Sequence, residues 1–178
     1  NPYALCPTGH PFKAYQTNLS HAKFEPETGS WIAPFIMASI NTRVVHRTNG
    51  LLNAEYGERF LYDEAMMTGK SAKGGVMGWT VTAAISGLMV GAALPPIRWI
   101  LENTVLPKPG EGPSEKEQLN GFFDYRIFGT SKDNKTLVVK VTGDRDPGYG
   151  STAKMLSEAA VSLAKDEEMK TVDGGFLT

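Results

Sequence analysis

The chain has 178 residues, enough for one domain of ordinary size with a buried core. Hydrophobic residues make up 41% of it and charged residues 21%, as in soluble globular proteins, and a formal net charge of -1 argues against a nucleic-acid partner, which needs a basic surface. The single cysteine, Cys6, excludes an intrachain disulfide, so nothing indicates secretion and we expect a cytoplasmic protein.

Both ends of the chain resemble cuts within a longer sequence. It opens at Asn1 without an initiator Met or a charged-then-apolar signal segment. It stops at Thr178, just after a turn-like stretch and two apolar residues. We therefore expect a fragment, whose function is one part of a larger function.

The first two segments differ in composition. Residues 1–33 are rich in Pro, Gly, Asn and Thr, which predicts an irregular arm held on a partner surface by its scattered aromatic residues. Beyond it, apolar residues recur at helical spacing, which predicts a helix over residues 34–52 that begins at a proline. The apolar face of this helix comprises Met37, Ile40, Val44, Thr48 and Leu51.

The middle of the chain is the most apolar part. Residues 58–67 alternate only in part and predict a strand. Residues 74–97 carry no formal charge and are long enough to span a bilayer. Glycines, hydroxyl residues and a proline pair lower their hydrophobicity, so we expect a helix packed against a sheet. Contact of residues 74–101 with a membrane surface is the less favoured alternative.

The remaining elements predict the fold class. Residues 102–118 read as an exposed loop. Residues 122–129 and 136–142 read as two strands of a hairpin, and residues 151–166 as an amphipathic helix. The order of elements predicts an α+β domain over residues 34–178, with helices packed on one side of one mixed or antiparallel sheet.

A glycine motif precedes the final helix. It spells G-x-G-x-x-A after a strand, as in a dinucleotide fingerprint, but an intervening loop and the short chain beyond it argue against a nucleotide site. Free N–H groups at a helix start still favour a negative ligand. The candidate substrate contacts here are Gly148, Tyr149, Gly150, Ser151 and Thr152. Capping of the helix by Ser151 or Thr152 would explain both residues without a ligand.

The predicted first helix carries a stripe of basic residues. Arg43, His46 and Arg47 are spaced so that they lie side by side on the face opposite the apolar residues. Two arginines could hold a carboxylate or a phosphate, so Arg43 and Arg47 are candidate substrate contacts. The alternative is that the stripe is simply the solvated face of the helix.

Other reactive side chains form no recognisable site. His10 and His21 have no metal-ligand spacing to each other or to Cys6, so no metal is expected. Asp144 and Asp146 form a close carboxylate pair, but their setting fits a plain surface turn better than acid–base catalysis. The residues by themselves therefore predict no complete active site.

Three stretches of the chain, taken in order, resemble a known domain. They are residues 29–35 together with 40–47, residues 122–129 and residues 143–153, with residues 173–178 closing the chain. Together they are similar to the carboxy-terminal domain of the saccharopine dehydrogenase-like oxidoreductases, a family that includes trans-acting enoyl reductases. The resemblance implies an upstream Rossmann domain, absent from this chain, that binds NAD(P). It implies that this chain is the second domain, which closes the cleft over the nicotinamide.

The resemblance also implies an activity for the full-length protein. Hydride would pass to a C=C, C=N or C=O bond of a small or lipid-like substrate, and Tyr149 would be a proton donor or a lid. No cofactor is expected in this chain alone, and no residue matches a known catalytic acid or base. The partners are its own Rossmann domain and a second copy. The alternatives are a non-catalytic dimerisation or lipid-surface domain, or an independent binding module.

Overall fold

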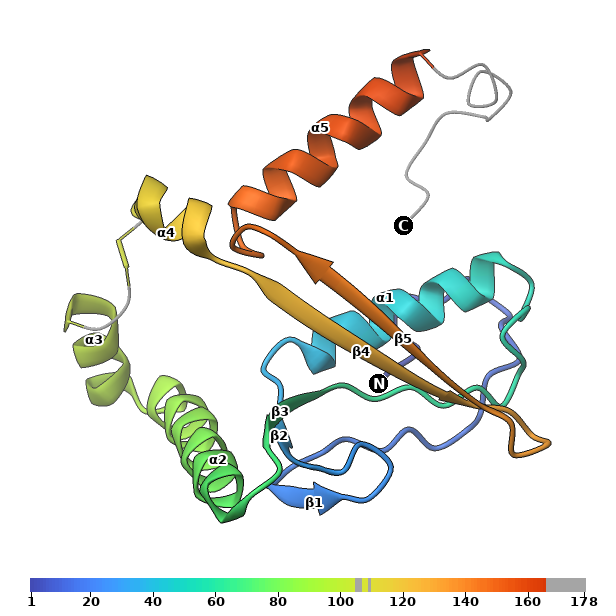
Figure 1. Ribbon diagram of the computed structural model, residues 1–178, viewed down its shortest axis with the longest axis horizontal. Helices are drawn as coiled ribbons and strands as arrows, with labels where there is room; N and C mark the ends of the chain where they lie inside the picture. Colours follow the sequence, from blue (N-terminus) through green and yellow to red (C-terminus); the bar gives the residue numbers. More distant parts are fainter. Residues whose placement is uncertain (105–106, 109, 166–178) are drawn as a thin grey trace. The chain divides into compact units, whose positions relative to one another are not determined.

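The computed structural model describes residues 1–104, 107–108 and 110–165, so the closing segment 173–178 lies outside the described residues (Figure 1). These residues fall into two compact units, which meet in sequence near residue 105. Each unit combines helices with antiparallel strands, and the predicted α+β class is confirmed. The prediction of one common sheet is wrong, because each unit builds a small sheet of its own.

The first unit is built on a three-stranded antiparallel sheet. Its strands are β1 (Lys23–Glu25), β2 (Ser30–Pro34) and β3 (Ala65–Gly69), in the order β1-β2-β3. The arm is therefore not irregular throughout, because Ile32 and Ala33 are buried in the central strand. The predicted strand over residues 58–67 begins too early and overlaps β3 only at its end.

Helix α1 (Ala38–Leu51) confirms a helix within the predicted range 34–52, but it does not begin at the proline, because Pro34 ends strand β2. Its faces are also reversed. The residues buried on it are Ala38, Thr42, His46 and Asn49. The apolar residues Met37, Ile40, Val44 and Leu51, expected in the core, are exposed. Hydrogen bonds explain the reversal, because the Asn49 amide donates to the Gly57 carbonyl at 3.1 Å and accepts from the Tyr56 N–H at 2.9 Å.

Helix α2 (Ala72–Ala93) packs on the sheet through glycines. A Cβ placed on Gly74 would overlap the backbone of Gly69, and one on Gly75 would lie 2.9 Å from the ring of Trp31. Helix and sheet thus approach each other more closely than any larger residue would allow. The expected helix against a sheet is confirmed, but only small residues are buried on it.

Helix α3 (Pro95–Thr104) follows α2 after a break at Leu94. The proline pair causes the break, since the residue before a proline is held out of the helical region. Ile97 and Leu101 of α3 lie against Gly91, where a Cβ would come within 3.0 and 3.3 Å of their side chains. The apolar stretch is therefore two helices that contact each other, and not one.

The second unit contains a hairpin and two helices. Helix α4 (Glu115–Asn120) starts at a capping box between Ser114 and Glu117, inside the segment expected to be a loop. Strands β4 (Phe123–Thr130) and β5 (Thr136–Gly143) form the predicted hairpin. Helix α5 (Gly150–Lys165) matches the predicted final helix.

The faces of the hairpin differ in chemistry. Tyr125 lies opposite Val141 and Ile127 opposite Val139, so one face is apolar. On the other face the carboxylate of Asp124 pairs with the side chains of Arg126 at 3.3 Å and Lys140 at 3.4 Å. The alternation in sequence thus appears as two distinct surfaces.

The glycine face of α2 gives a test of this packing. We expect Gly74→Ala to lower the free energy of unfolding by about 1–3 kcal/mol, because the new methyl group would force the helix off β3. Gly87→Ala is the matched control, since nothing lies within 4 Å of a Cβ at that position, and it should raise helix stability by about 0.5–1 kcal/mol. Thermal unfolding followed by circular dichroism measures both. Equal effects of the two changes would contradict the close approach.

Candidate functional site

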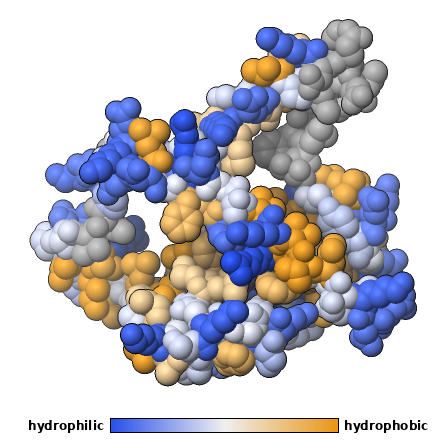
Figure 2. Space-filling model, in the orientation of Figure 1, coloured by the Kyte–Doolittle hydropathy of each residue, from blue (hydrophilic) through white to orange (hydrophobic). Residues whose placement is uncertain are grey.

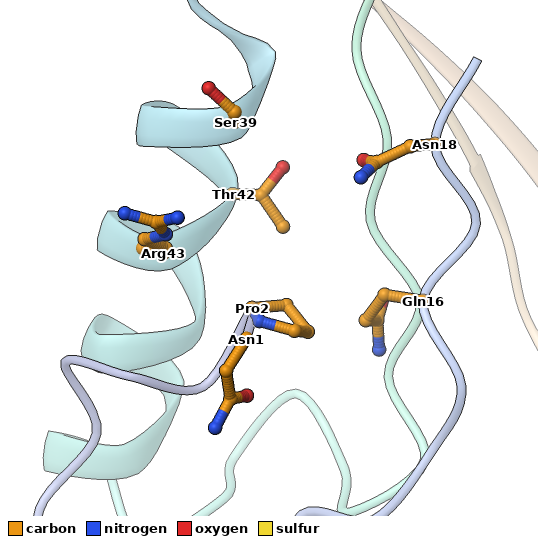
Figure 3. A pocket seen from close by; sticks show the side chains of 7 residues that line it. All are labelled: Asn1, Pro2, Gln16, Asn18, Ser39, Thr42 and Arg43. Carbon is orange, nitrogen blue, oxygen red and sulfur yellow. The ribbon is translucent and has the colours of Figure 1, made fainter. Parts of the chain in front are cut away.

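A polar pocket of about 100 Å³ opens between α1 and the amino-terminal arm (Figure 3). Both elements contribute residues to its wall. Its lining residues are Asn1, Pro2, Gln16, Asn18, Ser39, Thr42 and Arg43. Arg43, which the sequence nominates for substrate contact, is therefore part of a cavity.

Helical spacing explains why α1 can supply three of these side chains. Ser39, Thr42 and Arg43 are three and four residues apart, so they lie on one side of the helix. Thr42 is only 4% exposed, and among the described residues its Oγ1 has no hydrogen-bond partner. Figure 3 shows Thr42 directed from α1 toward the segment that carries Gln16 and Asn18. A buried hydroxyl without a partner costs about 1–3 kcal/mol, which a polar group bound in the pocket would offset.

Gln16 fixes the opposite wall of the pocket. Its Nε2 donates to the hydroxyl of Tyr3 at 2.6 Å and to the Phe60 carbonyl at 2.9 Å. Its Oε1 accepts from the N–H of Tyr62 at 3.1 Å. Both amide hydrogens are thus engaged, so Gln16 positions the arm and leaves ligand contact to its neighbours.

The lining indicates what the pocket can hold. Arg43 is the one charged side chain that lines it, and the other polar groups are hydroxyls and amides. Such a set is suited to a carboxylate or a phosphate, which accept several hydrogen bonds at once. Whole-ligand pockets usually enclose about 300–1,000 Å³, so a cavity this small would hold one polar group of a larger molecule.

Arg47 lies near the arm and outside the pocket lining. Its Nη1 donates to the backbone carbonyl of Leu5 at 2.8 Å, which ties the arm to α1. Burial raises the pKa of the nearby Cys6 thiol, while the charge of Arg47 acts in the opposite direction. The structure therefore gives the two predicted arginines different surroundings.

His46 is not on the solvated face where the sequence analysis placed it. It is 1% exposed, and its ring centroid lies 4.8 Å from that of Tyr3, 5.8 Å from that of Phe60 and 6.5 Å from that of Phe12. Its Nε2 has no hydrogen-bond partner among the described residues. Burial lowers the pKa of His46 and favours the neutral ring. The aromatic residues of the arm were the signal for this cluster.

The glycine turn at the start of α5 lies in the second unit and already holds a carboxylate. Asp146 accepts from the N–H groups of Gly150 at 2.6 Å, Gly148 at 2.9 Å and Tyr149 at 3.1 Å. These hydrogen bonds hold the pKa of Asp146 below its ordinary value. An anionic ligand at this helix start would have to displace the chain's own side chain.

Ser151 and Thr152 do not cap α5. The Ser151 hydroxyl donates to the Arg145 carbonyl at 3.0 Å, and the Thr152 hydroxyl donates to the Pro147 carbonyl at 2.7 Å. Asp146, which the sequence analysis assigned to a plain turn, takes the capping role instead. The expected cap residues therefore stabilise the loop that leads into the helix.

The glycine motif does not fit a dinucleotide. The strand before it, β5, pairs antiparallel with β4, whereas the dinucleotide fold starts from a parallel sheet. The N–H groups that would bind a pyrophosphate are bonded to Asp146. Nor do three or more His, Cys, Asp or Glu side chains come together as metal ligands anywhere in the described part of the chain.

Comparison with known proteins points to reductases. A Mycobacterium tuberculosis protein, provisionally named a trans-acting enoyl reductase, is 34% identical over 187 residues, which cover 100% of this chain and 44% of that protein. Trans-acting enoyl reductases of Mycobacterium bovis and Mycobacterium leprae are 34% and 35% identical over 156 residues, which cover 84% of this chain and 36% of each of them. No family model and no solved structure matches. The similarities support an enoyl-reductase-like family, and the chain spans less than half the length of these relatives.

Burial of His46 makes the stability of the first unit depend on pH. Its pKa is lowered in the folded state, so the folded protein binds a proton less readily than the unfolded chain. The stabilisation is present above the ordinary value of 6.5 and is lost as the pH falls through the lowered folded pKa. Because of this loss, we expect the denaturation midpoint to fall as the pH is lowered from about 7 to about 5.

Two variants isolate the contribution of this ring. His46→Phe keeps an aromatic ring among its neighbours and should flatten the pH dependence. His21→Gln changes an exposed histidine and should leave the pH dependence of stability as in the parent. A His46→Phe protein with the same pH dependence as the parent would contradict the assignment.

Proposed function

We propose that the chain is the substrate-side domain of a saccharopine dehydrogenase-like oxidoreductase that reduces a C=C, C=N or C=O bond. The observation that carries the proposal is the 34% identity over the whole chain with a relative named for enoyl reduction. The enoyl name favours a C=C bond conjugated to a carbonyl as the first substrate class to test. The pocket at Arg43 is consistent with a domain that holds one anionic part of such a substrate.

The cofactor in this proposal is NAD(P)H, bound by a Rossmann domain elsewhere in a longer polypeptide. The chain spans 44% of the Mycobacterium tuberculosis relative, which leaves room for a second domain of similar size. Within the described residues, the one glycine motif is occupied by Asp146 and does not fit the cofactor. Bound NAD(P)H would supply the hydride, and the residues of this chain would bind and orient the acceptor.

Arg43 has a specific role in this proposal. Its guanidinium would pair with a carboxylate or phosphate of the substrate, remote from the bond that is reduced. The Thr42 hydroxyl would donate a hydrogen bond to the same group, which would account for its lack of a partner among the described residues. Arg47 in the first unit, and Tyr149 with the Gly148–Thr152 turn in the second unit, remain further candidate contacts.

Variants of the longer polypeptide test the pocket. With a 2-enoyl thioester as the varied substrate, Arg43→Ala should raise KM by about tenfold with a smaller change in kcat, because it removes binding and leaves the reacting bond untouched. Thr42→Val should raise KM as well without lowering the unfolding midpoint, since it removes a hydroxyl that has no partner in the part of the chain that the structure describes. Arg59→Ala, which removes an exposed cation outside the pocket lining, is the control. Unchanged KM values for both pocket variants would remove the pocket from the substrate site.

A separate experiment tests which part of the longer polypeptide binds the cofactor. The 178-residue chain should neither enhance NAD(P)H fluorescence nor consume NAD(P)H with enoyl, imine or carbonyl compounds. The longer polypeptide should consume NADH or NADPH only when one of these acceptors is present. Cofactor binding by the 178-residue chain would contradict the assignment of domains, and a longer polypeptide inert toward all three classes would contradict the proposed activity.

A further inference from the structure

Helix α2 carries large apolar side chains on the side opposite its glycine face. Val76 is 70% exposed and Val90 61%, and Trp79 between them is also exposed. These residues are spaced so that they lie on one side of the helix, whereas Gly74, Gly75 and Gly78 lie on the side that meets the sheet. Apart from Lys73 and a few hydroxyl residues, the helix thus carries small or apolar side chains on both sides, which is typical of a helix covered on both sides.

The helix cannot turn its large side chains inward. The backbone of Gly69 fills the space beside Gly74, and the ring of Trp31 fills the space beside Gly75. Leaving a Val side chain in water instead of burying it loses about 1.5–3 kcal/mol. The outward face is therefore left as an exposed apolar surface of the first unit.

Helix α3 extends the same apolar surface. Leu94, Trp99 and Ile100 are exposed at and beyond the break between the helices. Figure 2 shows hydrophobic side chains gathered over α3 and the neighbouring part of α2. Both helices thus present a tryptophan to solvent, and tryptophan is enriched where proteins meet the headgroup region of a membrane.

The charges around this surface favour a lipid cover. Residues 65–101 contain no Asp or Glu but include Lys70, Lys73 and Arg98, although the whole chain has a net charge of -1. Arg98 is paired with Glu102 at 2.7 Å, so Lys70, just before α2, and Lys73, in its first turn, carry most of the positive field. Basic residues beside an apolar face are the pattern that binds anionic membrane surfaces.

The contact with the sheet determines how α2 could meet a bilayer. By length and composition alone, its 22 residues could cross a membrane. A crossing would carry the sheet and its charged edge, including Lys23 and Glu25, into the hydrocarbon. An orientation in the plane of the interface keeps the sheet in water and places only the outward face among the lipids.

We propose that α2 and α3 dock the protein on an anionic membrane surface. The side chains of Val76, Trp79 and Val90 enter the boundary between headgroups and acyl chains, and Lys70 and Lys73 contact the phosphates. The surface stands on the first unit alone and does not rest on the proposed reductase function.

Flotation of the 178-residue chain with vesicles tests the proposal. The chain should float with vesicles of phosphatidylcholine and phosphatidylglycerol, and less with phosphatidylcholine alone or at high salt. The double change Val76→Glu and Val90→Glu should lower the bound fraction at least about tenfold, because it places carboxylates in the apolar boundary. The control is Leu156→Glu and Leu163→Glu on α5, where the side chains are as exposed, at 70% and 64%.

A second measurement does not depend on destabilising the protein. In variants that keep one tryptophan and carry Phe at the other two positions, brominated lipids should quench Trp79 and Trp99. They should not quench Trp31, whose ring lies against Gly75 between helix and sheet. Quenching of Trp31 to the same extent would indicate an unfolded chain on the lipid and would overturn the proposal.

Two further outcomes would also overturn it. One is a chain that is folded by circular dichroism but binds neither vesicle type, or whose control variant loses as much vesicle binding as the Val76 and Val90 variant. The other is a dimer by sedimentation velocity that the Val76 and Val90 changes dissociate while vesicle binding is absent. That result would assign the outward face to a second copy.

Discussion

The close approach of α2 to the three-stranded sheet determines the arrangement of the first unit. Gly74 lies on the backbone of Gly69 and Gly75 on the ring of Trp31, so the helix can meet the sheet with one side only. Every large apolar side chain on the opposite side is consequently turned outward. The same constraint that joins helix and sheet thus produces the apolar surface of this unit.

The packing of helix α1 depends on buried polar groups. Asn49 and Thr42 face the interior. The hydrogen bonds of Asn49 hold the following loop against the helix, and those of Gln16 join the arm to that loop. Because the polar side of α1 is the buried side, the cavity that forms beneath the arm is lined by hydroxyls, amides and Arg43. A polar site is therefore a direct result of how this helix is packed.

Local patterns in the sequence predicted the elements better than their surroundings. Alternation identified the β4–β5 hairpin, and helical spacing identified α1 and α5. The faces of α1 were wrong because an apolar stripe was expected to meet a core within the same chain, whereas here it is exposed. Arg43 could be nominated from α1, but Gln16 could not, since its contacts join residues more than forty positions apart.

The hairpin bears on whether the second unit could exist by itself. In the described part of the chain β4 and β5 pair only with each other, and each keeps one edge open. An isolated two-stranded hairpin is at best marginally stable in water. Its apolar face, with Ile127 and Val139 exposed, adds no core of its own. Residues 107–165 are therefore poorly suited to excision as an autonomous module. A boundary drawn near residue 105 separates the two units in sequence without making both of them independent folding units.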